Sequence, residues 1–245
     1  MLVLTLGNVE YGLAWRVQRR LAEWRVRGAV GDLLLLLEHP PTITLGRGAR
    51  SRHLLATPET LAREGIAVLE VDRGGDVTYH GPGQLVGYPI LDLRARGGDL
   101  HRYLRDVEEA LILALAGLGV QAGRLPPHTG VWVDGAKVAA IGVKVSRWVS
   151  MHGFALNVNP PMAHFGLIVP CGIADLPVAS LASILGAPPA MEAAAAAVKT
   201  AFGRVFGPSR PGAPCADSLR ALLAELDGPL REVLEPALDA AEEVC

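Results

Sequence analysis

The sequence predicts an α/β (α+β) fold in which a mixed sheet is flanked by helices. Half of the 245 residues are hydrophobic, enough to fill a large core. Apolar runs of strand length are interleaved with longer segments of helical periodicity, the pattern of a sheet covered by helices. A proline-rich stretch at 208–214 separates this region from a short C-terminal segment. We therefore expect a core domain over 1–207, then a linker and extra C-terminal helices over 208–245, packed on the core.

Local signals predict the elements of the N-terminal part. Apolar residues recur at helical spacing between residues 8 and 27 and predict a helix there. Thr57 and Pro58 are residue types preferred at an N-cap and in a first turn, so a second helix starts there and ends near Gly65. Short apolar runs predict strands at 1–6, 33–38, 42–45 and 66–71.

The second half of the chain continues the same alternation. Asp99 is a suitable cap for a helix that runs to about Leu118. The dipeptide Asp134-Gly135 favours a hairpin turn, so the apolar runs around it predict an antiparallel meander. We expect strands at 85–93, 130–133, 137–145 and 149–158, and helices at 178–185, 191–205 and 218–244, the last interrupted near 228–229.

Composition narrows the class of protein. The net charge of -2 gives no general case for nucleic-acid binding. No apolar run reaches the roughly 18 residues that cross a bilayer, so we expect no membrane insertion. The first residues carry no basic segment of a signal peptide, which predicts a cytoplasmic protein. Cys171, Cys215 and Cys245 form neither a metal pattern nor a disulfide framework, so we expect reduced thiols.

The densest group of glycine and polar residues runs from Arg73 to Gln84, and we interpret it as a loop and turn between two strands. Its four glycines let a ligand approach the backbone closely, and Pro82 shapes the loop. Loops on a rigid scaffold often carry function, although a plain polar hairpin has the same composition. The residues favour a binding or catalytic site.

Cys171 lies between Pro170 and Gly172, at a bend that could present a nucleophile. A small buried hydrophobe explains the position equally well. Cys215, beside Pro214, and the last residue of the chain have no comparable setting.

Only three of the 23 basic residues are lysines, at positions 137, 144 and 199. An ammonium near a thiol favours the thiolate, and lysine, unlike arginine, can later accept a proton. Lys137 is the stronger candidate, because an unbroken strand would turn Lys144, seven residues on, to the opposite face. An exposed strand lysine is the ordinary alternative for each.

Small residues recur in the predicted meander and could leave a narrow apolar slot for an unbranched acyl chain. Tight packing within the sheet would explain them as well. His80 and His152 suit hydrogen-bonding positions in the wall of such a slot, which is also the commoner use of a lone histidine. The small residues are Ala139, Ala140, Gly142, Gly153 and Ala155.

Several blocks in order resemble the lipoyl(octanoyl) transferase family over roughly residues 1–206. The first is Arg-Gly-Gly-x-x-Thr-Tyr-His-Gly-Pro-Gly-Gln-Leu-Val-x-Tyr-Pro at 73–89. The others are Gly-Val-Trp-Val at 130–133, Lys-Val-Ala-Ala-Ile-Gly-Val at 137–143, His-Gly-Phe-Ala-Leu-Asn at 152–157 and Pro-Cys-Gly at 170–172.

The resemblance implies a catalytic domain like that of biotin and lipoate protein ligases. It implies transfer of an octanoyl group from octanoyl-acyl carrier protein to a lysine of lipoyl domains, the first step of endogenous protein lipoylation. The acceptors would be lipoyl domains of 2-oxoacid dehydrogenase complexes and the glycine cleavage H protein. No cofactor, metal, nucleic acid or membrane is implied.

The resemblance also implies site residues. The acyl-thioester nucleophile falls on Cys171 and its partner lysine on Lys137. The acyl-binding segments fall on Arg73, Gly74, Gly75, Asp76, Val77, Thr78, Tyr79 and His80, on Ala140, Ile141 and Gly142, and on Gly153, Phe154 and Ala155.

Two features depart from the family pattern. Lys144 stands where relatives tend to carry arginine, and the segment after Gly207 is longer than the family core requires. Because both partner proteins would be acidic, docking needs a basic patch. The loop with Arg47, Arg50 and Arg52 supplies one, unless it is an ordinary solvated loop.

Three other functions compete. A lipoate or biotin protein ligase activates a free acid with ATP, but it needs no thiol nucleophile, and no Walker-type phosphate loop is present. A non-catalytic acyl-binding protein needs neither Cys171 nor Lys137. A transferase that moves the acyl group between two lipoyl-bearing proteins would share the cysteine chemistry and differ only in its donor.

Overall fold

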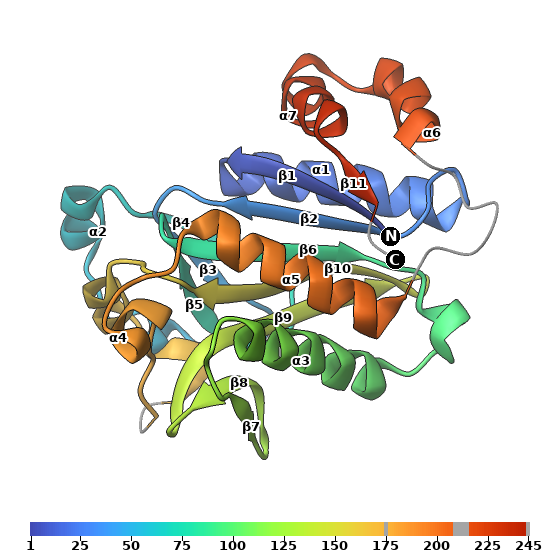
Figure 1. The fold of residues 1–245 in the computed structure, drawn as a ribbon. Coiled ribbons are helices and arrows are strands. Elements are labelled where there is room, and N and C mark those ends of the chain that lie inside the picture. The colour runs from blue at the N-terminus through green and yellow to red at the C-terminus, as the bar shows by residue number, and fades with distance from the viewer. Residues whose placement is uncertain (174–175, 208–215, 244–245) are drawn as a thin grey trace.

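The computed structural model describes residues 1–173, 176–207 and 216–243, and its centre is a large mixed sheet (Figure 1). The strand order is β11-β1-β2-β6-β10-β9-β8-β7, in which only β1 and β2 are parallel neighbours. The strands are β1 (Leu2–Asn8), β2 (Leu33–Glu38), β6 (Gln84–Ile90), β7 (Gly123–Leu125), β8 (His128–Val133), β9 (Ala136–Ser146), β10 (Val149–Asn157) and β11 (Glu242–Glu243).

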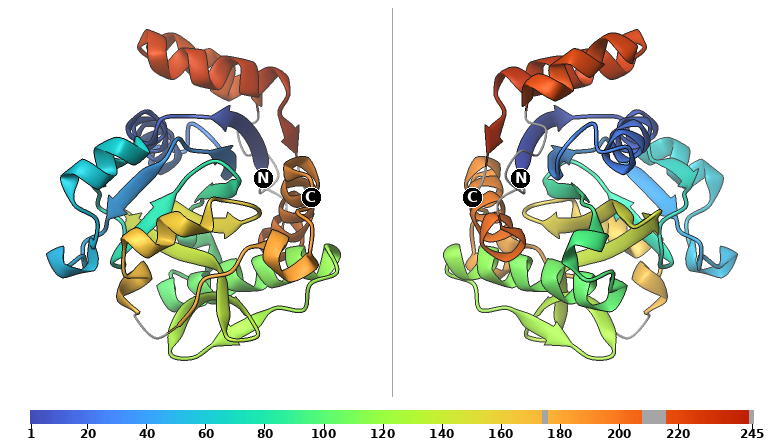
Figure 2. Two further views of the ribbon diagram at one scale, coloured as in Figure 1. Left: turned by 90° about the vertical axis from the view of Figure 1, so that its left-hand side faces the viewer. Right: turned by 90° about the vertical axis from the view of Figure 1, so that its right-hand side faces the viewer.

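Helices cover both faces of this sheet (Figures 1 and 2). Helices α3 (Leu100–Gly117) and α5 (Met191–Phe206) pack together on one face, and α1 (Tyr11–Val26) packs on the other. Side chains of a strand alternate between faces. Leu34 and Leu36 of β2 accordingly join the core under α3 and α5, and Leu33, Leu35 and Leu37 join the core under α1.

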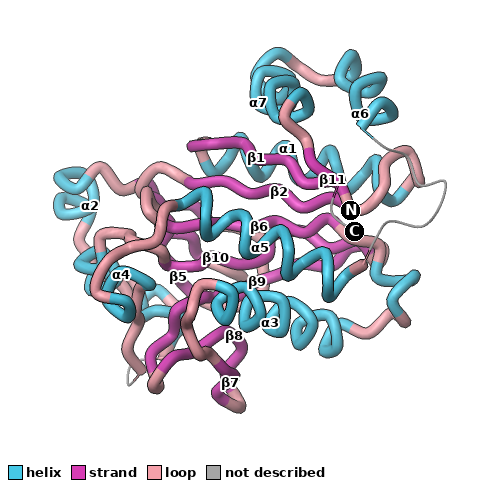
Figure 3. The backbone as a smooth tube through the Cα atoms, in the orientation of Figure 1, coloured by secondary structure: helices cyan, strands magenta, loops and turns pink. Residues whose placement is uncertain are grey.

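A second, three-stranded sheet has the order β4-β3-β5 and a core of its own. Its strands are β3 (Thr42–Leu45), β4 (Ala67–Glu70) and β5 (Val77–His80). The remaining helices are short (Figure 3): α2 (Pro58–Glu64), α4 (Leu181–Leu185), α6 (Ala216–Leu222) and α7 (Gly228–Asp239), with 3-10 turns at Ser51–His53, Leu93–Arg96, Met162–Leu167, Pro170–Gly172 and Leu223–Glu225.

Most predicted elements are confirmed, and β2 and β3 match the prediction to the residue. Thr57 caps α2 by accepting a hydrogen bond from the Thr60 N–H, and Gly65 ends the helix in a left-handed conformation, with φ 64°. Asp134 and Gly135 both have positive φ, 48° and 79°, as a type I′ hairpin turn requires.

Three local predictions were wrong. The segment from Arg73 to Gln84 is not only a loop, because Val77–His80 forms β5 and pairs with β3. The predicted helix at 178–185 begins only at Leu181, capped by Ser180. The last helix ends at Asp239, and β11 then pairs with the edge of β1. The linker at 208–214, Cys215 and residues 244–245 lie outside the described residues.

The C-terminal segment packs on the core, since α7 contacts both β1 and α1. Asp227 caps α7 and also forms an ion pair with Arg16 of α1. The division of the chain at residue 207 stays a prediction. Across the described ranges, no helix is both long and apolar enough to cross a membrane.

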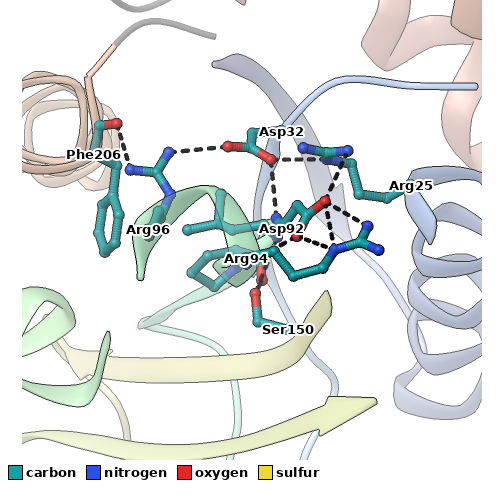
Figure 4. Close-up of polar contacts among 9 residues, drawn as sticks. Arg25, Asp32, Asp92, Arg94, Arg96, Ser150 and Phe206 are labelled. Atoms are coloured by element: carbon teal, nitrogen blue, oxygen red, sulfur yellow. Dashed lines mark hydrogen bonds and ion pairs between the residues drawn. The ribbon is translucent and has the colours of Figure 1, made fainter. Parts of the chain in front are cut away.

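An ionic network joins the ends of several elements on the side of the sheet where β2 begins (Figure 4). Asp32 accepts from Arg25 of α1 at 2.8 Å and from Arg96 at 2.9 Å. It also accepts from the Asp92 N–H, and Arg96 donates to the Phe206 carbonyl of α5 at 2.7 Å. The network therefore connects α1, β2, the end of β6 and α5.

Candidate active site

A cavity of about 250 Å³ lies between β9, β10 and the small sheet, at the low end of the range for ligand sites. It brings together residues that are far apart in the sequence, from Tyr11 to Ile173. From the predicted set it contains Cys171, Lys137, Arg73, Gly74, Gly75, Asp76, Thr78, His80, Ala140, Ile141, Gly142, Gly153, Phe154 and Ala155.

Val77 and Tyr79 belong to the predicted acyl-binding set but do not line the cavity. Both side chains are fully buried in the core of the small sheet. Because successive side chains of a strand point to opposite faces, β5 offers only Thr78 and His80 to the cavity.

The cavity also has wall residues outside the predicted catalytic and acyl-binding sets. His152, which the sequence predicts as a hydrogen-bonding wall residue, is one of them. Tyr88 lies in a block that resembles the family, so the sequence contained a signal for it. The others come from α1, from β8 and the residue before it, and from the turn after Cys171, where no motif marks them. The additional residues are Tyr11, Tyr88, Pro127, His128, Thr129, His152 and Ile173.

Cys171 lies in a tight turn with an uncommon backbone conformation. Its φ and ψ are 56° and 17°, and Gly172 follows with φ 69°. A left-handed conformation at a residue other than glycine costs free energy and is often found at functional sites. The Val169 N–H donates to the His53 carbonyl at 2.8 Å, which ties the turn to the segment after β3.

Gly172 is required for space as well as for conformation. A Cβ atom there would lie 2.6 Å from Oδ2 of Asp76 and 3.2 Å from Cε1 of His53. Asp76 Oδ2 in turn accepts from Nδ1 of His53 at 2.6 Å. The nucleophile turn therefore packs directly on a carboxylate–imidazole pair.

A bulge in β9 directs Lys137 into the cavity. Val131 of β8 pairs with Ala139, but Trp132 pairs with Lys137, so β9 carries one extra residue at Val138. Both Val138 and Ala139 lie in the core under α3 and α5. The alternation of β9 therefore restarts at Ala139.

The bulge corrects the expectation that Lys137 and Lys144 face opposite sides. The prediction assumed an unbroken strand, and the extra residue shifts the pattern by one. Lys137 lines the cavity with Ala140 and Gly142, and Lys144 reaches Asp72, which binds the cavity residue His152.

Lys137 has no carboxylate partner among the described residues, although only 7 % of its surface is exposed. Its ammonium lies 4.8 Å from the centre of the Trp132 ring, a cation–π contact. Gly130 leaves room for the lysine, since a Cβ there would lie 3.3 Å from Lys137 Cε. A buried ammonium without a protein anion is available to an anion in the cavity, such as the Cys171 thiolate.

Close backbone packing holds Arg73 and Gly74 against β9. The Gly74 N–H donates to the Val143 carbonyl at 2.8 Å, and a Cβ on Gly142 would lie 3.0 Å from the Gly74 carbonyl. The Arg73 guanidinium is buried and donates to both the hydroxyl and the carbonyl of Thr44. Arg73 thus joins the small sheet to the cavity wall.

The end of the cavity near α1 holds several paired polar side chains. The Tyr11 hydroxyl and Nδ1 of His152 are 3.3 Å apart, and His39 contacts the Tyr88 hydroxyl through Nε2 at 2.6 Å. Burial raises the pKa of Tyr11 to about 12 and lowers the pKa of His39 to about 4, so both groups are neutral near pH 7.

Asp72 links this end of the cavity to Lys144. Its carboxylate accepts from Lys144 at 2.5 Å and from Nε2 of His152 at 2.8 Å. Burial opposes ionisation of Asp72, but these two hydrogen bonds outweigh it and hold its pKa below the usual value. Burial lowers the pKa of His152, which is therefore neutral near pH 7.

His80 presents an unpaired nitrogen. Gln84 donates through Nε2 to the Tyr79 carbonyl and to Asn157, which leaves its Oε1 to accept from Nδ1 of His80 at 2.8 Å. Burial holds the pKa of His80 well below its usual value, so the ring is neutral and Nε2 is an acceptor. Nε2 has no hydrogen-bond partner in the described structure.

Comparisons with known proteins agree with this fold and show its family. The model of the lipoyl protein ligase A/B catalytic domain matches residues 10–203. An octanoyltransferase of Chloroflexus aggregans is 56% identical over 196 residues, which are 78% of this chain and 89% of that protein. An octanoyltransferase of Geobacter metallireducens is 53% identical over 188 residues, 77% of this chain and 85% of that one.

Solved structures show the same fold at low identity. A lipoate-protein ligase A bound with ATP has a TM-score of 0.70 at 14% identity, covering 97% of this chain and 93% of that chain. A bipartite lipoate protein ligase of Thermoplasma acidophilum has a TM-score of 0.68, also at 14% identity, covering 97% and 91%. These confirm the expected biotin/lipoate protein ligase-like fold, and the close relatives decide the family: the chain belongs to the octanoyltransferases.

Proposed function

We propose that this protein transfers an octanoyl group from octanoyl-acyl carrier protein to a lysine of a lipoyl domain through a thioester on Cys171. Octanoyl transfer in protein lipoylation is the activity of the family to which the chain belongs. The observation that carries the proposed route is that Cys171 and the unpaired Lys137 line one cavity.

In the first half-reaction, the Cys171 thiolate attacks the thioester carbonyl of the donor. The bond from the carbonyl carbon to the donor sulfur breaks, and Lys137 protonates the departing thiolate. One thioester replaces another, so the step is close to neutral in free energy and needs no ATP. Lys137 is left as a neutral amine.

In the second half-reaction, the acceptor lysine attacks acyl-Cys171. Its nitrogen forms the amide bond, the bond to the Cys171 sulfur breaks, and neutral Lys137 accepts a proton from the attacking nitrogen. The thiolate and the ammonium of the resting enzyme are restored. Such a two-step exchange gives ping-pong kinetics.

The acyl chain would lie along β9 and β10, where Gly142 and Gly153 are part of the cavity wall. The two glycines are paired with each other across the strands. A Cβ on Gly153 would lie 2.2 Å from the Gly87 carbonyl, so no larger residue fits there. Phe154 and Ala155 complete this wall.

The oxyanion of each tetrahedral intermediate needs N–H donors. The Gly172 N–H is already used, because it donates to the Val169 carbonyl at 3.0 Å. The edge of β9 beyond Ala139, where pairing with β8 has ended, is the better source of such donors.

The proposed donor is octanoyl-acyl carrier protein, and the proposed acceptors are lipoyl domains of 2-oxoacid dehydrogenase complexes and the glycine cleavage H protein. The exposed residues Arg47, Arg50 and Arg52 offer a docking surface for acidic partners. Their loop adjoins the cavity, since the Arg47 N–H donates to the Arg73 carbonyl and the Gly48 N–H to the Gly75 carbonyl. We propose a cytoplasmic location, where a thiol nucleophile stays reduced.

The first test is incubation with octanoyl-acyl carrier protein without ATP, followed by intact mass and peptide mapping. We expect one octanoyl adduct on Cys171 that is discharged when a lipoyl domain is added. Cys171→Ser and Cys171→Ala variants should lack this labile thioester and its turnover. Activity only with free octanoate and ATP would instead indicate a ligase, and a Cys171→Ser variant with normal turnover would rule out the proposed nucleophile.

A further inference from the structure

The proposed reaction leaves one proton that Lys137 cannot take. At pH 7 the acceptor lysine is an ammonium and must lose two protons to become an amide nitrogen. Lys137, neutral after the first half-reaction, can accept only one of them. This difference of one proton rests on the proposed function. It requires a second proton acceptor at the place where the acceptor lysine enters.

His53 lies beside the nucleophile turn with the geometry of such an acceptor. The Asp76 carboxylate accepts from Nδ1 of His53 at 2.6 Å, so Nδ1 carries a hydrogen, and in the neutral form of the ring Nε2 is the acceptor. The other oxygen of Asp76 accepts from the Val77 N–H at 2.7 Å, which fixes the carboxylate. Nε2 has no hydrogen-bond partner among the described residues, and the His53 side chain is partly accessible, with 12% of its surface exposed.

The contacts of the turn place this pair next to Cys171. A Cβ atom on residue 172 would lie 3.2 Å from Cε1 of His53, the ring atom bonded to both nitrogens. The His53 carbonyl holds the Val169 N–H, so His53 and the turn keep one relative position. Asp76 itself lines the cavity.

We propose that His53, held by Asp76, is the second proton acceptor of the transfer to lysine. Nε2 of His53 takes the first proton from the incoming ammonium and forms an imidazolium beside the Asp76 carboxylate. The neutral amine then attacks acyl-Cys171, Lys137 takes the second proton, and the carbon–sulfur bond breaks. The imidazolium returns its proton to water, which completes the balance.

The histidines that line the cavity are less suited to this role than His53, which lies beside the nucleophile turn. His152 is 1 % exposed and has both ring nitrogens in contact with partners, Tyr11 and Asp72. His80 is buried, and its ring lies 5.4 Å from the Tyr11 ring, at the α1 end of the cavity. His128 is the one rival on the described wall, but it has no carboxylate partner.

The test separates the two half-reactions. Wild-type and His53→Gln enzymes are first loaded with octanoyl on Cys171, and the adduct is quantified by mass. Discharge is then timed in single turnovers, once with a lipoyl domain and once with hydroxylamine, which is mostly uncharged at neutral pH. Because hydroxylamine has no ammonium proton to lose, its reaction needs only Lys137.

We expect His53→Gln to slow discharge by the lipoyl domain about 100-fold, the usual range for loss of a proton acceptor, and to change discharge by hydroxylamine less than about threefold. Added imidazole should restore the lipoyl-domain rate in His53→Ala. The exposed His101 of α3 provides a matched control, His101→Gln, with both rates unchanged.

Equal losses with both nucleophiles would show that His53 only supports the turn and would overturn the inference. A selective loss in His128→Gln, with His53→Gln unaffected, would assign the role to His128 instead. If the wild-type enzyme forms no adduct on Cys171, the proposed function fails before His53 is tested, so the two failures are distinguishable.

Discussion

The two ends of α1 and β2 have opposite electrostatic character. At one end, Arg25 of α1 and Asp32, just before β2, belong to an ionic network. The carboxylates of this network, Asp32 and Asp92, each have arginine partners. At the other end, Tyr11 lines the cavity, and His39, the residue after β2, contacts the cavity residue Tyr88. The same cavity contains the Lys137 ammonium, which has no carboxylate partner within the described part of the chain. The same two elements therefore serve as a scaffold at one end and as a site at the other.

The difference shows that conformations and contacts that lower stability are concentrated at the cavity end. The cavity end contains Cys171 and His152 with positive φ, and an unpaired nitrogen on buried His80. Such features persist only where the surrounding structure holds them in place. The Asp32 network supplies part of that support by joining α1, β2 and α5 away from the chemistry.

The largest expected effect is that of Lys137→Arg, at the cavity end. Arginine keeps the positive charge that favours the thiolate but cannot accept a proton near pH 7. Arginine also cannot protonate the departing thiolate, but a thiolate can leave unprotonated, so we expect acylation of Cys171 to slow much less than transfer to the lipoyl domain, which should fall about 100-fold or more, as measured by single-turnover rates. Equal loss of both half-reactions would mean that the lysine acts only through its shape or charge.

Gly172→Ala should damage both stability and acylation. Its Cβ would meet Asp76 Oδ2 at 2.6 Å in a residue with φ 69°. We expect a loss of about 2–3 kcal/mol in the free energy of unfolding, together with slower thioester formation. Gly186→Ala is the matched control, since Gly186 has φ 78° but a Cβ there would meet nothing within 4 Å. Its cost should be about 1–2 kcal/mol with acylation unchanged.

Asp32→Ala should separate the scaffold from the site. It removes the partner of Arg25 and Arg96, which are both largely buried. Arg25 keeps its contact with Asp92 at 3.7 Å, but Arg96 loses its carboxylate partner. This loss should cost about 2 kcal/mol, measured by chemical denaturation, while octanoyl transfer per folded molecule stays unchanged. A fall in specific activity without a loss of stability would contradict the division into a stabilising network at one end of α1 and β2 and a site at the other.

Acid should destabilise the protein through His39. Its pKa is about 4 in the fold and about 6.5 when unfolded, so between these values the unfolded chain binds more protons. The stabilisation is complete above pH ~6.5 and is lost as the pH falls toward 4, at about 1.4 kcal/mol per pH unit. His39→Gln should flatten the dependence of unfolding free energy on pH, whereas His101→Gln should leave it unchanged.

The smallest expected effect is that of the basic loop. Neutralising Arg47, Arg50 and Arg52 to glutamine should raise the KM for the carrier substrate about fivefold at low salt and leave kcat unchanged. The difference from the wild type should shrink as the ionic strength rises. An unchanged KM would show that the loop is an ordinary solvated one.

Periodicity and turn chemistry were enough to predict most of the fold from the sequence. They failed where a segment becomes a strand only because another strand pairs with it. Val77–His80 pairs with β3, and Glu242–Glu243 pairs with the outer edge of β1. The sequence blocks that resemble the octanoyltransferase family predicted most of the residues that line the cavity. Tyr11 and His128 lacked such a signal, and the pairing of His53 with Asp76 depends on tertiary contacts.

The extra residue at Val138 has an evolutionary consequence. The face that residue 137 occupies depends on how many residues separate it from Ala139, so side-chain identity elsewhere in β9 does not set it. Strict alternation over the same residues would place Lys137 on the core face with Ala139, whereas deleting Val138 would remove the bulge and keep the lysine on the cavity face. A change of pairing register between Lys137 and Ala139, as well as replacement of Lys137 itself, is therefore a route by which a descendant of this protein would lose its lysine from the site.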